Sequence, residues 1–349
     1  MALSKPQLGI QSPIQCQLCE RDPKISWKCF ECDLLMCCVC KNNIHPKIKT
    51  AKEHKIIAIK DIGNSPSVVP SKIDMTIIET YQTKLDQVRE LAISSDGLLW
   101  IGDGHRKNKI RLLTPHTGLQ KVKFEGDKLK VIYSFNTSVY DIAVTLDNDL
   151  LIANGEPKLK QIKSGTNKVV DTVYDVPEPS SIHVTRHNKI VVGIPGGKVI
   201  VMDHDGNRDK VYGNGHHKDT LFYPWKITST SNDNIFVVDY NTTENERRVV
   251  VLGHKDIINT YSGHAAINIE DNPFTPYDLT TTPSDNVIVV DGRKTLHILN
   301  SFGYLVTFIN TEDKGITYPF SIGLAKEDKS CMLYIGTFGK IYKLNLIGC

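Results

Sequence analysis

The chain has 349 residues, of which 40% are hydrophobic and 23% charged, and its formal net charge is +3. This composition is typical of a globular protein of two or three domains, and so small a net charge gives no sign of a nucleic-acid-binding protein. The N-terminal segment lacks the apolar core of a signal peptide, and no run reaches the ~18 apolar residues of a membrane helix. We therefore expect a cytoplasmic protein with no membrane contact, in which thiols stay reduced.

Seven of the nine cysteines lie between residues 16 and 40. Three Cys-x-x-Cys pairs and two later histidines stand out: Cys16, Cys19, Cys29, Cys32, Cys37, Cys40, His45 and His54. A Cys-x-x-Cys turn presents two thiolates to one ion, and a tetrahedral zinc site needs four ligands, so eight ligands indicate two Zn²⁺ ions. A disulfide framework is the alternative, but a reducing compartment and the closing histidines argue against it. The segment is also too short and polar to bury a core, so metal would supply its folding free energy.

The ligand spacing C-x2-C-x9-C-x2-C-x4-C-x2-C-x4-H-x8-H, within residues 11–60, resembles the B-box zinc finger of tripartite-motif (TRIM) proteins. The resemblance implies a cross-brace, in which alternate ligand pairs share an ion. One zinc would then be held by Cys16, Cys19, Cys37 and Cys40, and the other by Cys29, Cys32, His45 and His54. Cys38 is left over; it would replace Cys37 in another register, although the spacing favours Cys37.

Residues 61–75 are rich in Ser and Pro and are predicted to form a linker. A full TRIM protein carries a RING domain before the B-box and a long coiled coil after it. Fifteen residues before Cys16 leave no room for a RING domain, and residues 75–90 are too short for a coiled coil. We therefore expect no direct ubiquitin-ligase activity, although an accessory role in ubiquitination stays open, as do the oligomeric state and the completeness of the chain.

From residue 88 onward the sequence repeats six times, and the units begin 41 to 52 residues apart. Each unit has a short alternating strand, a turn rich in Asp, Asn and Gly, and a more apolar strand, as in "VYDIAVTLDNDLLIAN". A third strand follows in every unit and a fourth in the first five. Four short strands in about 40–50 residues are typical of one propeller blade, so we predict an all-β six-bladed β-propeller over residues 76–349.

The last repeat contains only three strands, which would leave the ring open. Residues 76–83, "TIIETYQT", have strand character, and we predict that they complete the sixth blade. The units resemble NHL repeats, which form the C-terminal propeller of some TRIM proteins. The blade entries that carry this resemblance are Tyr223-Pro224-Trp225, Thr275-Pro276-Tyr277 and Tyr318-Pro319-Phe320.

The connections between second and third strands share one face of a propeller with the blade entries, and each of these connections carries Lys or Arg. The basic candidates for a ligand face are Arg106, Lys107, Lys109, Lys158, Lys160, Lys198, Arg247, Arg248, Arg293, Lys294 and Lys340. The aromatic candidates beside them are Tyr140, Tyr223, Trp225, Tyr277 and Tyr318. Such a face suits a protein or peptide partner or single-stranded RNA, unless acidic residues in the same loops cancel its charge and leave it without a dominant ligand.

A catalytic propeller is the remaining class. Some six-bladed propellers hold a divalent cation on the axis with Glu, Asn and Asp and hydrolyse lactones or esters. Here Asp141, His183 and Asp278 lie near first strands, but they differ in type and are taken to lack a common offset, so we assign no catalytic residues. The sequence therefore predicts a zinc-binding adaptor for a protein or peptide partner, with an RNA-binding regulator and an accessory ubiquitination factor as alternatives.

Overall fold

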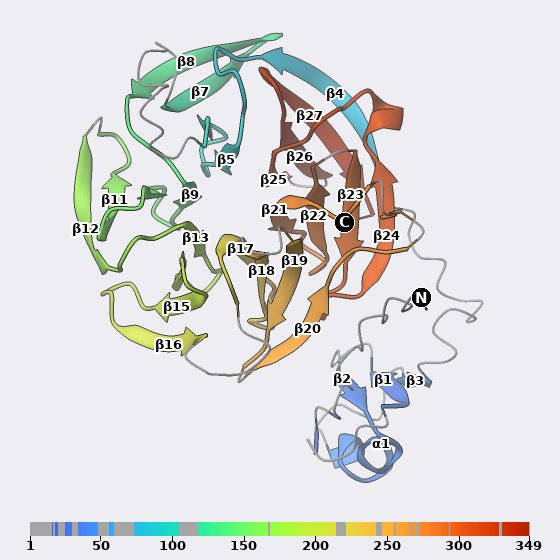
Figure 1. Cartoon of the computed structure of the whole chain (residues 1–349). Helices are drawn as coiled ribbons and strands as arrows, with labels where there is room; N and C mark the ends of the chain where they lie inside the picture. Colours follow the sequence, from blue (N-terminus) through green and yellow to red (C-terminus); the bar gives the residue numbers. More distant parts are fainter. Residues whose placement is uncertain are drawn as a thin grey trace, which may run out of the picture. The chain divides into compact units, whose positions relative to one another are not determined.

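A computed structural model describes most of the chain, which divides into two compact units, Met1–Lys72 and Ile73–Cys349 (Figure 1). The described residues are 16, 18–19, 25–29, 34–47, 56–58, 73–104, 118–166, 168–213, 221–241, 246–254, 256–265, 267–269, 272–292, 294–327 and 330–348. Within these residues no helix combines the length and the apolar character needed to cross a lipid bilayer.

The N-terminal unit contains a small antiparallel sheet with the strand order β2-β1-β3. Its elements are β1 (Trp27–Cys29), β2 (Leu34–Met36), α1 (Cys38–Asn43), the 3-10 helix η1 (His45–Lys47) and β3 (Ile56–Ala58). Met36 is fully buried among cysteines, and Trp27 and Leu34 pack against the same cluster. The apolar side chains therefore surround sulfur atoms, and the described part of this unit has no separate hydrophobic core.

The second unit is a six-bladed β-propeller, as predicted, and every blade is a four-stranded antiparallel sheet. Blade one contains β5 (Glu90–Ile93), β6 (Leu99–Gly102), β7 (Leu119–Glu125) and β8 (Lys128–Phe135). Blade two contains β9 (Asp141–Val144), β10 (Leu150–Ala153), β11 (Lys158–Ile162) and β12 (Val169–Asp175). Blade three contains β13 (Ser181–Val184), β14 (Ile190–Ile194), β15 (Lys198–Met202) and β16 (Arg208–Tyr212).

The other three blades continue the ring in chain order (Figure 1). Blade four contains β17 (Pro224–Ser229), β18 (Ile235–Asn241), β19 (Glu246–Leu252) and β20 (Ile257–Tyr261). Blade five contains β21 (Pro276–Thr281), β22 (Val287–Asp291), β23 (Thr295–Leu299) and β24 (Leu305–Asn310). Blade six contains β25 (Ser321–Glu327), β26 (Ser330–Gly336), β27 (Lys340–Ile347) and β4 (Asp74–Gln82); the short η4 (Glu312–Lys314) precedes it.

The burial of each strand follows its place in the blade. Second strands such as β22, "VIVVD", are buried at every position because neighbouring blades cover both faces of the sheet. Outer strands such as β8 alternate between half-buried and exposed side chains. The hydrophobic clusters lie between consecutive blades; one joins Val238 of blade four to Leu279 of blade five. Blade-to-blade packing therefore forms a continuous core around the axis.

The turn between the first and second strands explains why the repeats are visible in the sequence. In blades two to five, Asn148, Asn188, Asp233 and Asp285 adopt positive φ values between 58° and 68°. Asn and Asp tolerate this left-handed conformation better than most residues, and Gly97 serves the same purpose in blade one. The Asp, Asn and Gly of the predicted turns are thus required by the backbone.

The sixth blade is completed by a strand from the start of the propeller unit. β4 pairs antiparallel with β27, with Ile77 opposite Leu344 and Tyr81 opposite Ile341, and Figure 1 shows it along the outer edge of that blade. β4 contains most of the segment expected to close the ring, but it begins at Asp74, inside the range assigned to the linker. Residues 61–72 of that linker lie outside the described residues.

Candidate functional site

Four cysteines of the N-terminal unit form a compact cluster. The sulfur atoms of Cys16, Cys19, Cys37 and Cys40 all lie within 4.8 Å of one another, and three of these residues are buried. The Cys19 and Cys37 sulfurs are 4.0 Å apart. Sulfurs bound to one tetrahedral zinc at ~2.3 Å lie about 3.8 Å from each other. The donor set and its spacing therefore fit one zinc ion.

Helix α1 places two members of this cluster. Cys37 is the N-cap residue, and its sulfur accepts a hydrogen bond from the backbone N–H of Cys40 at 3.4 Å. Cys38 is exposed instead, and its sulfur accepts a hydrogen bond from Trp27 Nε1 at 3.2 Å. The helix register thus turns Cys37 into the cluster and Cys38 away from it.

Only half of the second predicted zinc set falls within the described residues. Cys29 and His45 are both fully buried in the N-terminal unit, whereas Cys32 and His54 lie outside the described residues. The second zinc site accordingly stays a prediction.

The propeller carries a polar ring at its axis, built from one equivalent position in each first strand. The six members, in blade order, are Glu90, Asp141, Ser181, Lys226, Asp278 and Ser321. All six are at most 7% exposed. Blades on opposite sides of the ring carry the same residue type at this position: Asp in blades two and five, and Ser in blades three and six. The exception is Glu90 of blade one, which faces Lys226 of blade four. The axis therefore combines approximate two-fold repetition with one opposite-charge pair.

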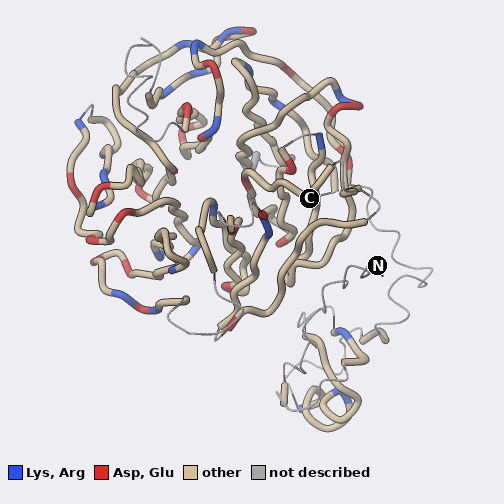
Figure 2. Tube along the Cα trace, in the orientation of Figure 1, with Lys and Arg blue, Asp and Glu red and all other residues tan. Residues whose placement is uncertain are grey.

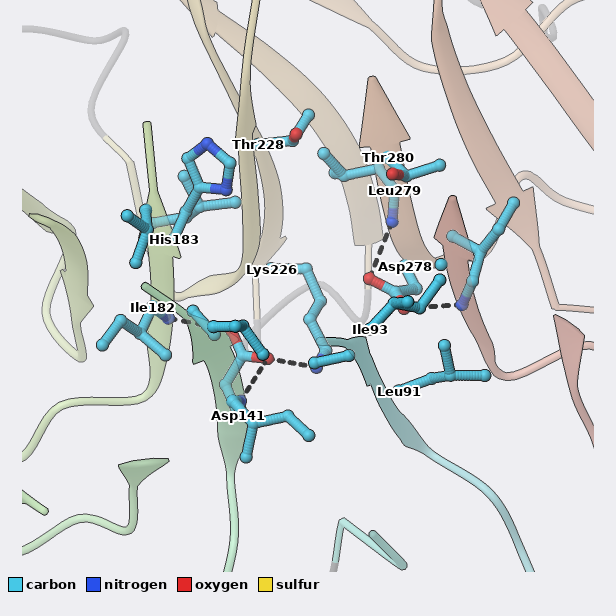
Figure 3. Close-up of a pocket in the computed structure, with 18 of the residues that line it drawn as sticks. Leu91, Ile93, Asp141, Ile182, His183, Lys226, Thr228, Asp278, Leu279 and Thr280 are labelled. Atoms are coloured by element: carbon cyan, nitrogen blue, oxygen red, sulfur yellow. Dashed lines mark hydrogen bonds and ion pairs between the residues drawn. The ribbon is translucent and has the colours of Figure 1, made fainter. Parts of the chain in front are cut away.

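Lys226 joins three blades through its ammonium group. Its Nζ contacts Glu90 Oε2. It also lies 2.6 Å from Asp141 Oδ1, an interaction drawn in Figure 3. Burial opposes the charge on Lys226, but the carboxylates of Asp141 and Glu90 outweigh it and raise the lysine pKa above its usual range. Burial also raises the pKa of Glu90, and that of Asp278 to about 7, with partial compensation by Lys226. One ammonium thus serves three carboxyl groups and stays protonated.

The two aspartates of the ring also tie adjacent blades together. Asp278 accepts hydrogen bonds from its own neighbour Leu279 N at 2.8 Å and from Ile322 N of blade six at 2.9 Å (Figure 3). Asp141 makes the corresponding pair of bonds within blade two and to blade three. Both carboxylates therefore have a structural role that is complete without a ligand.

A cavity of about 260 Å³ lies on the axis, beside the ring, and the first strands of all six blades line it. Its lining consists of ring residues and the residues that follow them, so it lies on the side of the first hairpin turns. Thr228, Thr280 and His183 add polar groups to apolar walls (Figure 3). Burial lowers the pKa of His183 to about 4, and its Nε2 lies 2.9 Å from Ser229 Oγ. The imidazole is therefore neutral near pH 7.

The axial residues do not fit a divalent cation. The space between Glu90 and Asp141, where a metal would find its acidic ligands, is occupied by the Lys226 ammonium. The expectation that Asp141, His183 and Asp278 lack a common offset is wrong for the two aspartates, which occupy equivalent positions. It holds for His183, which lies two residues beyond the ring position of its blade, Ser181. Aligning the repeats on their turn residues would have identified the ring.

The predicted basic face is neutralised in part where the structure describes it. Lys160 pairs with Glu156 at 3.0 Å and with Asp171 at 2.6 Å. Arg248 pairs with Asp239 at 3.0 Å. Lys294 pairs in the same way with Glu312 at 3.4 Å. Figure 2 shows acidic and basic positions interspersed around the ring. Lys158 and Lys198 are exposed and Lys340 is half-buried, whereas Arg106, Lys107, Lys109 and Arg293 lie outside the described residues.

Arg247 is the basic candidate that meets the aromatic ones. Its guanidinium carbon lies 4.6 Å from the ring centre of Tyr277, 4.8 Å from that of Tyr240 and 5.7 Å from that of Trp225. These distances are in the range of cation–π interactions. The sequence analysis named Arg247, Trp225 and Tyr277 but missed Tyr240, which lies in the second strand, away from the blade-entry motif.

The other aromatic candidates lie at the same blade entries. Tyr223 contacts Trp225 with ring centres 6.1 Å apart. Tyr140 packs against Gly155 so closely that a Cβ on the glycine would meet its ring at 2.6 Å. Tyr318 contacts Phe338 at 5.8 Å, and Phe338 is a second aromatic that the sequence analysis did not identify.

Comparisons with known proteins identify the architecture. The sequence matches no known family profile and no curated protein sequence. A candidate gluconolactonase solved as a structural-genomics target is 11% identical, with a TM-score of 0.53 over 80% of this chain and 94% of that chain. A gluconolactonase from Xanthomonas campestris is also 11% identical, with a TM-score of 0.56 over 78% of this chain and 89% of that chain. At this identity the likeness shows the fold, that of a six-bladed β-propeller.

Proposed function

We propose that this chain is a zinc-binding, protein-interaction adaptor whose propeller face binds a protein or peptide partner. The observation that carries this proposal is the position of Lys226. Its ammonium lies between the axial carboxyl groups, where a hydrolytic propeller of the metal-dependent kind would need a divalent cation. Its raised pKa keeps the amine protonated, so Lys226 is also no nucleophile. Binding at the blade entries is then the activity that the chain's residues support best.

The zinc part of the proposal rests on the cluster of Cys16, Cys19, Cys37 and Cys40. Four sulfurs at tetrahedral spacing suit a closed, structural zinc site, which would stabilise a unit with little apolar core. With the second ligand set, the unit would be a B-box-type finger, and the chain a TRIM-like protein with NHL-like repeats. The RNA-binding alternative is weakened by the ion pairs that Lys160, Arg248 and Lys294 make with Glu and Asp.

Metal content tests the zinc part directly. We expect two zinc ions per purified wild-type chain by mass spectrometry, and about one in Cys40→Ser, because that change removes a ligand of one site. Cys38→Ser is the matched control, since Cys38 lies in the same helix but outside the cluster. Wild-type protein without zinc would overturn the zinc-binding assignment, and equal losses in both variants would overturn this ligand set.

A further inference from the structure

Aromatic rings and two arginines form a continuous strip over the entries of blades four to six and one. We define this aromatic–arginine strip as Arg247, Tyr277, Phe320, Arg89, Phe338 and Tyr318. Tyr277, beneath the Arg247 guanidinium, contacts Phe320 with ring centres 5.8 Å apart. Arg89 lies 5.0 Å from the Phe320 ring, and Phe338 links Phe320 to Tyr318. Phe320 thus contacts Tyr277, Arg89 and Phe338, and these contacts connect blades five, six and one.

One end of the strip presents large rings to solvent. Tyr318 is 53% exposed and Phe338 is 49% exposed, and their rings contact each other. Tyr318 also has a φ of +53°, a conformation that a bulky residue adopts only at a cost. Glu178, which precedes a proline at the equivalent entry position of blade three, has a φ of +47°, so the conformation belongs to this type of blade entry. The exposure and mutual contact of the Tyr318 and Phe338 rings therefore mark this end of the strip.

The charge of the strip differs from that of the surrounding loops. Among the described residues, neither Arg89 nor Arg247 has an ion-pair partner. Arg89 Nε donates to Gln87 Oε1 at 2.6 Å, and Arg247 donates to the carbonyl of Pro276 at 3.4 Å. Arg248, the neighbour of Arg247, is already paired with Asp239. The two cations of the strip itself are therefore planar guanidinium groups, which suit a partner's carboxylates.

We propose that the aromatic–arginine strip binds an acidic peptide segment in which carboxylates alternate with aromatic side chains. This inference rests on the proposed function, namely that the propeller face binds a protein or peptide. The guanidinium groups of Arg89 and Arg247 pair with the carboxylates, and Tyr318 and Phe338 pack against the aromatic side chains. Single-stranded RNA would also stack on these rings, but its phosphates need a row of free cations, and the strip itself carries only the guanidinium groups of Arg89 and Arg247.

Fluorescence anisotropy with the full chain tests this assignment. The probe is a labelled alternating Glu–Tyr peptide; an alternating Lys–Tyr peptide and an oligouridylate serve as comparisons. We expect the Glu–Tyr peptide to bind, more weakly at higher salt. Tyr318→Asn and Arg247→Lys should each weaken binding about tenfold, because one removes a ring and the other the planar group that stacks on Tyr277. Tyr133→Asn is the matched control, since Tyr133 is 39% exposed on β8, outside the strip.

The choice of Tyr318→Asn separates binding from folding. Asn accepts a positive φ more readily than Tyr, so this variant should unfold at or above the wild-type temperature while losing affinity. If the Glu–Tyr peptide binds and neither strip variant weakens it, the strip is not its binding surface. If the Glu–Tyr peptide does not bind at all, the assignment of an acidic peptide ligand is wrong. If oligouridylate binds and both strip variants abolish that binding, the ligand of the strip is RNA and not a peptide. Zinc content is independent of every one of these outcomes.

Discussion

The two units of the chain each contain a buried cluster of groups that can carry negative charge, and the clusters differ in the source of the compensating cation. In the N-terminal unit, four sulfurs converge, while the nearby Lys41 ammonium lies 3.4 Å from the centre of the Trp27 ring. In the propeller, the Lys226 ammonium lies within the carboxylate cluster itself. Buried anions need a partner. Under the proposed zinc assignment, the thiolates of the first cluster would take their cation from solution, whereas the second cluster contains its own.

A concentration of side chains that can carry negative charge is therefore not by itself a metal site. Both clusters have the ligand types that metals take, thiolates in one and carboxylates in the other. What separates them is a single residue at the fourth repeat, Lys226, where a carboxylate, amide or hydroxyl side chain would have left room for a cation. Substitutions in the propeller test this contrast between an external and an internal cation.

Removing the internal cation should have the largest effect. Lys226→Met leaves Glu90 and Asp141 buried without their counter-charge, and we expect a loss of about 3–5 kcal/mol in the free energy of unfolding, measured by urea denaturation. Lys189→Met is the matched control, because Lys189 pairs with Asp209 at 2.9 Å on the surface, and it should cost less than about 1 kcal/mol. Comparable losses in the two variants would contradict the axial ion pair.

A second substitution at Lys226 should make the carboxyl cluster depend on an external cation, as is proposed for the cysteine cluster. In Lys226→Ala the carboxyl groups of Glu90, Asp141 and Asp278 surround a space without a cation, and oxygen ligands of this kind suit Ca²⁺. Added Ca²⁺ should then raise the unfolding temperature of the variant and leave that of the wild type unchanged. A wild-type propeller that Ca²⁺ stabilises equally would show that Lys226 does not take the place of a metal.

The contrast also predicts that the propeller depends on its closing strand for stability, as the N-terminal unit would depend on the proposed zinc ion. Met75 of β4 is fully buried against blade six, and Met75→Ala should cost about 2–4 kcal/mol in denaturant unfolding. Ile78→Ala, in the same strand, is the control because Ile78 is 51% exposed; its cost should stay near 0.5 kcal/mol. If both substitutions cost the same small amount, closure by β4 contributes little to stability.

Much of the propeller could be predicted from the sequence because its constraints are local. The turn residues Asn148 and Asp285 recur for a backbone reason, and strand alternation follows from burial. The polar ring could have been predicted, because Asp141 and Asp278 precede their turns by the same number of residues. It was missed because His183, which lies at a different position in its strand, was included in the comparison. The pairing of Lys226 with Glu90 could not be predicted, because only a closed ring brings blades one and four face to face.

In the N-terminal unit, by contrast, the residues of the candidate site could be predicted individually. Its cysteine spacing predicted a metal site at the level of single residues, and the structure brings Cys16, Cys19, Cys37 and Cys40 together. Ligand spacing is a strong local signal because each Cys-x-x-Cys pair is one turn. The partner face lacked such a signal, since the contact of Arg247 with Tyr240 depends on strand pairing.

The smallest expected effect is a pH dependence that originates in the surplus of carboxyl groups at the axis. The pKa of Asp278 is about 7 in the folded protein and 3.8 in the unfolded chain, because burial disfavours the carboxylate. The stability that this proton provides is present below pH 4 and is lost as pH rises through 7. His183 acts in the opposite sense: its pKa of about 4 lies below the unfolded value of 6.5, so its stability is lost as pH falls through 4.

Asp278→Asn isolates the first of these two effects, because His183 is unchanged in the variant. Relative to the variant, wild-type protein should lose about 1–2 kcal/mol of unfolding free energy between pH 4 and pH 8; water in the adjoining cavity keeps this below the full linkage value. Urea denaturation across this range measures it, with the exposed Asp147→Asn as a control that should parallel the wild type. A flat or rising difference would mean that Asp278 is ionised throughout. In that case Lys226 and the backbone N–H groups of Leu279 and Ile322 would fully compensate the buried Asp278 carboxylate, and no proton would be needed in the charge balance of the axis.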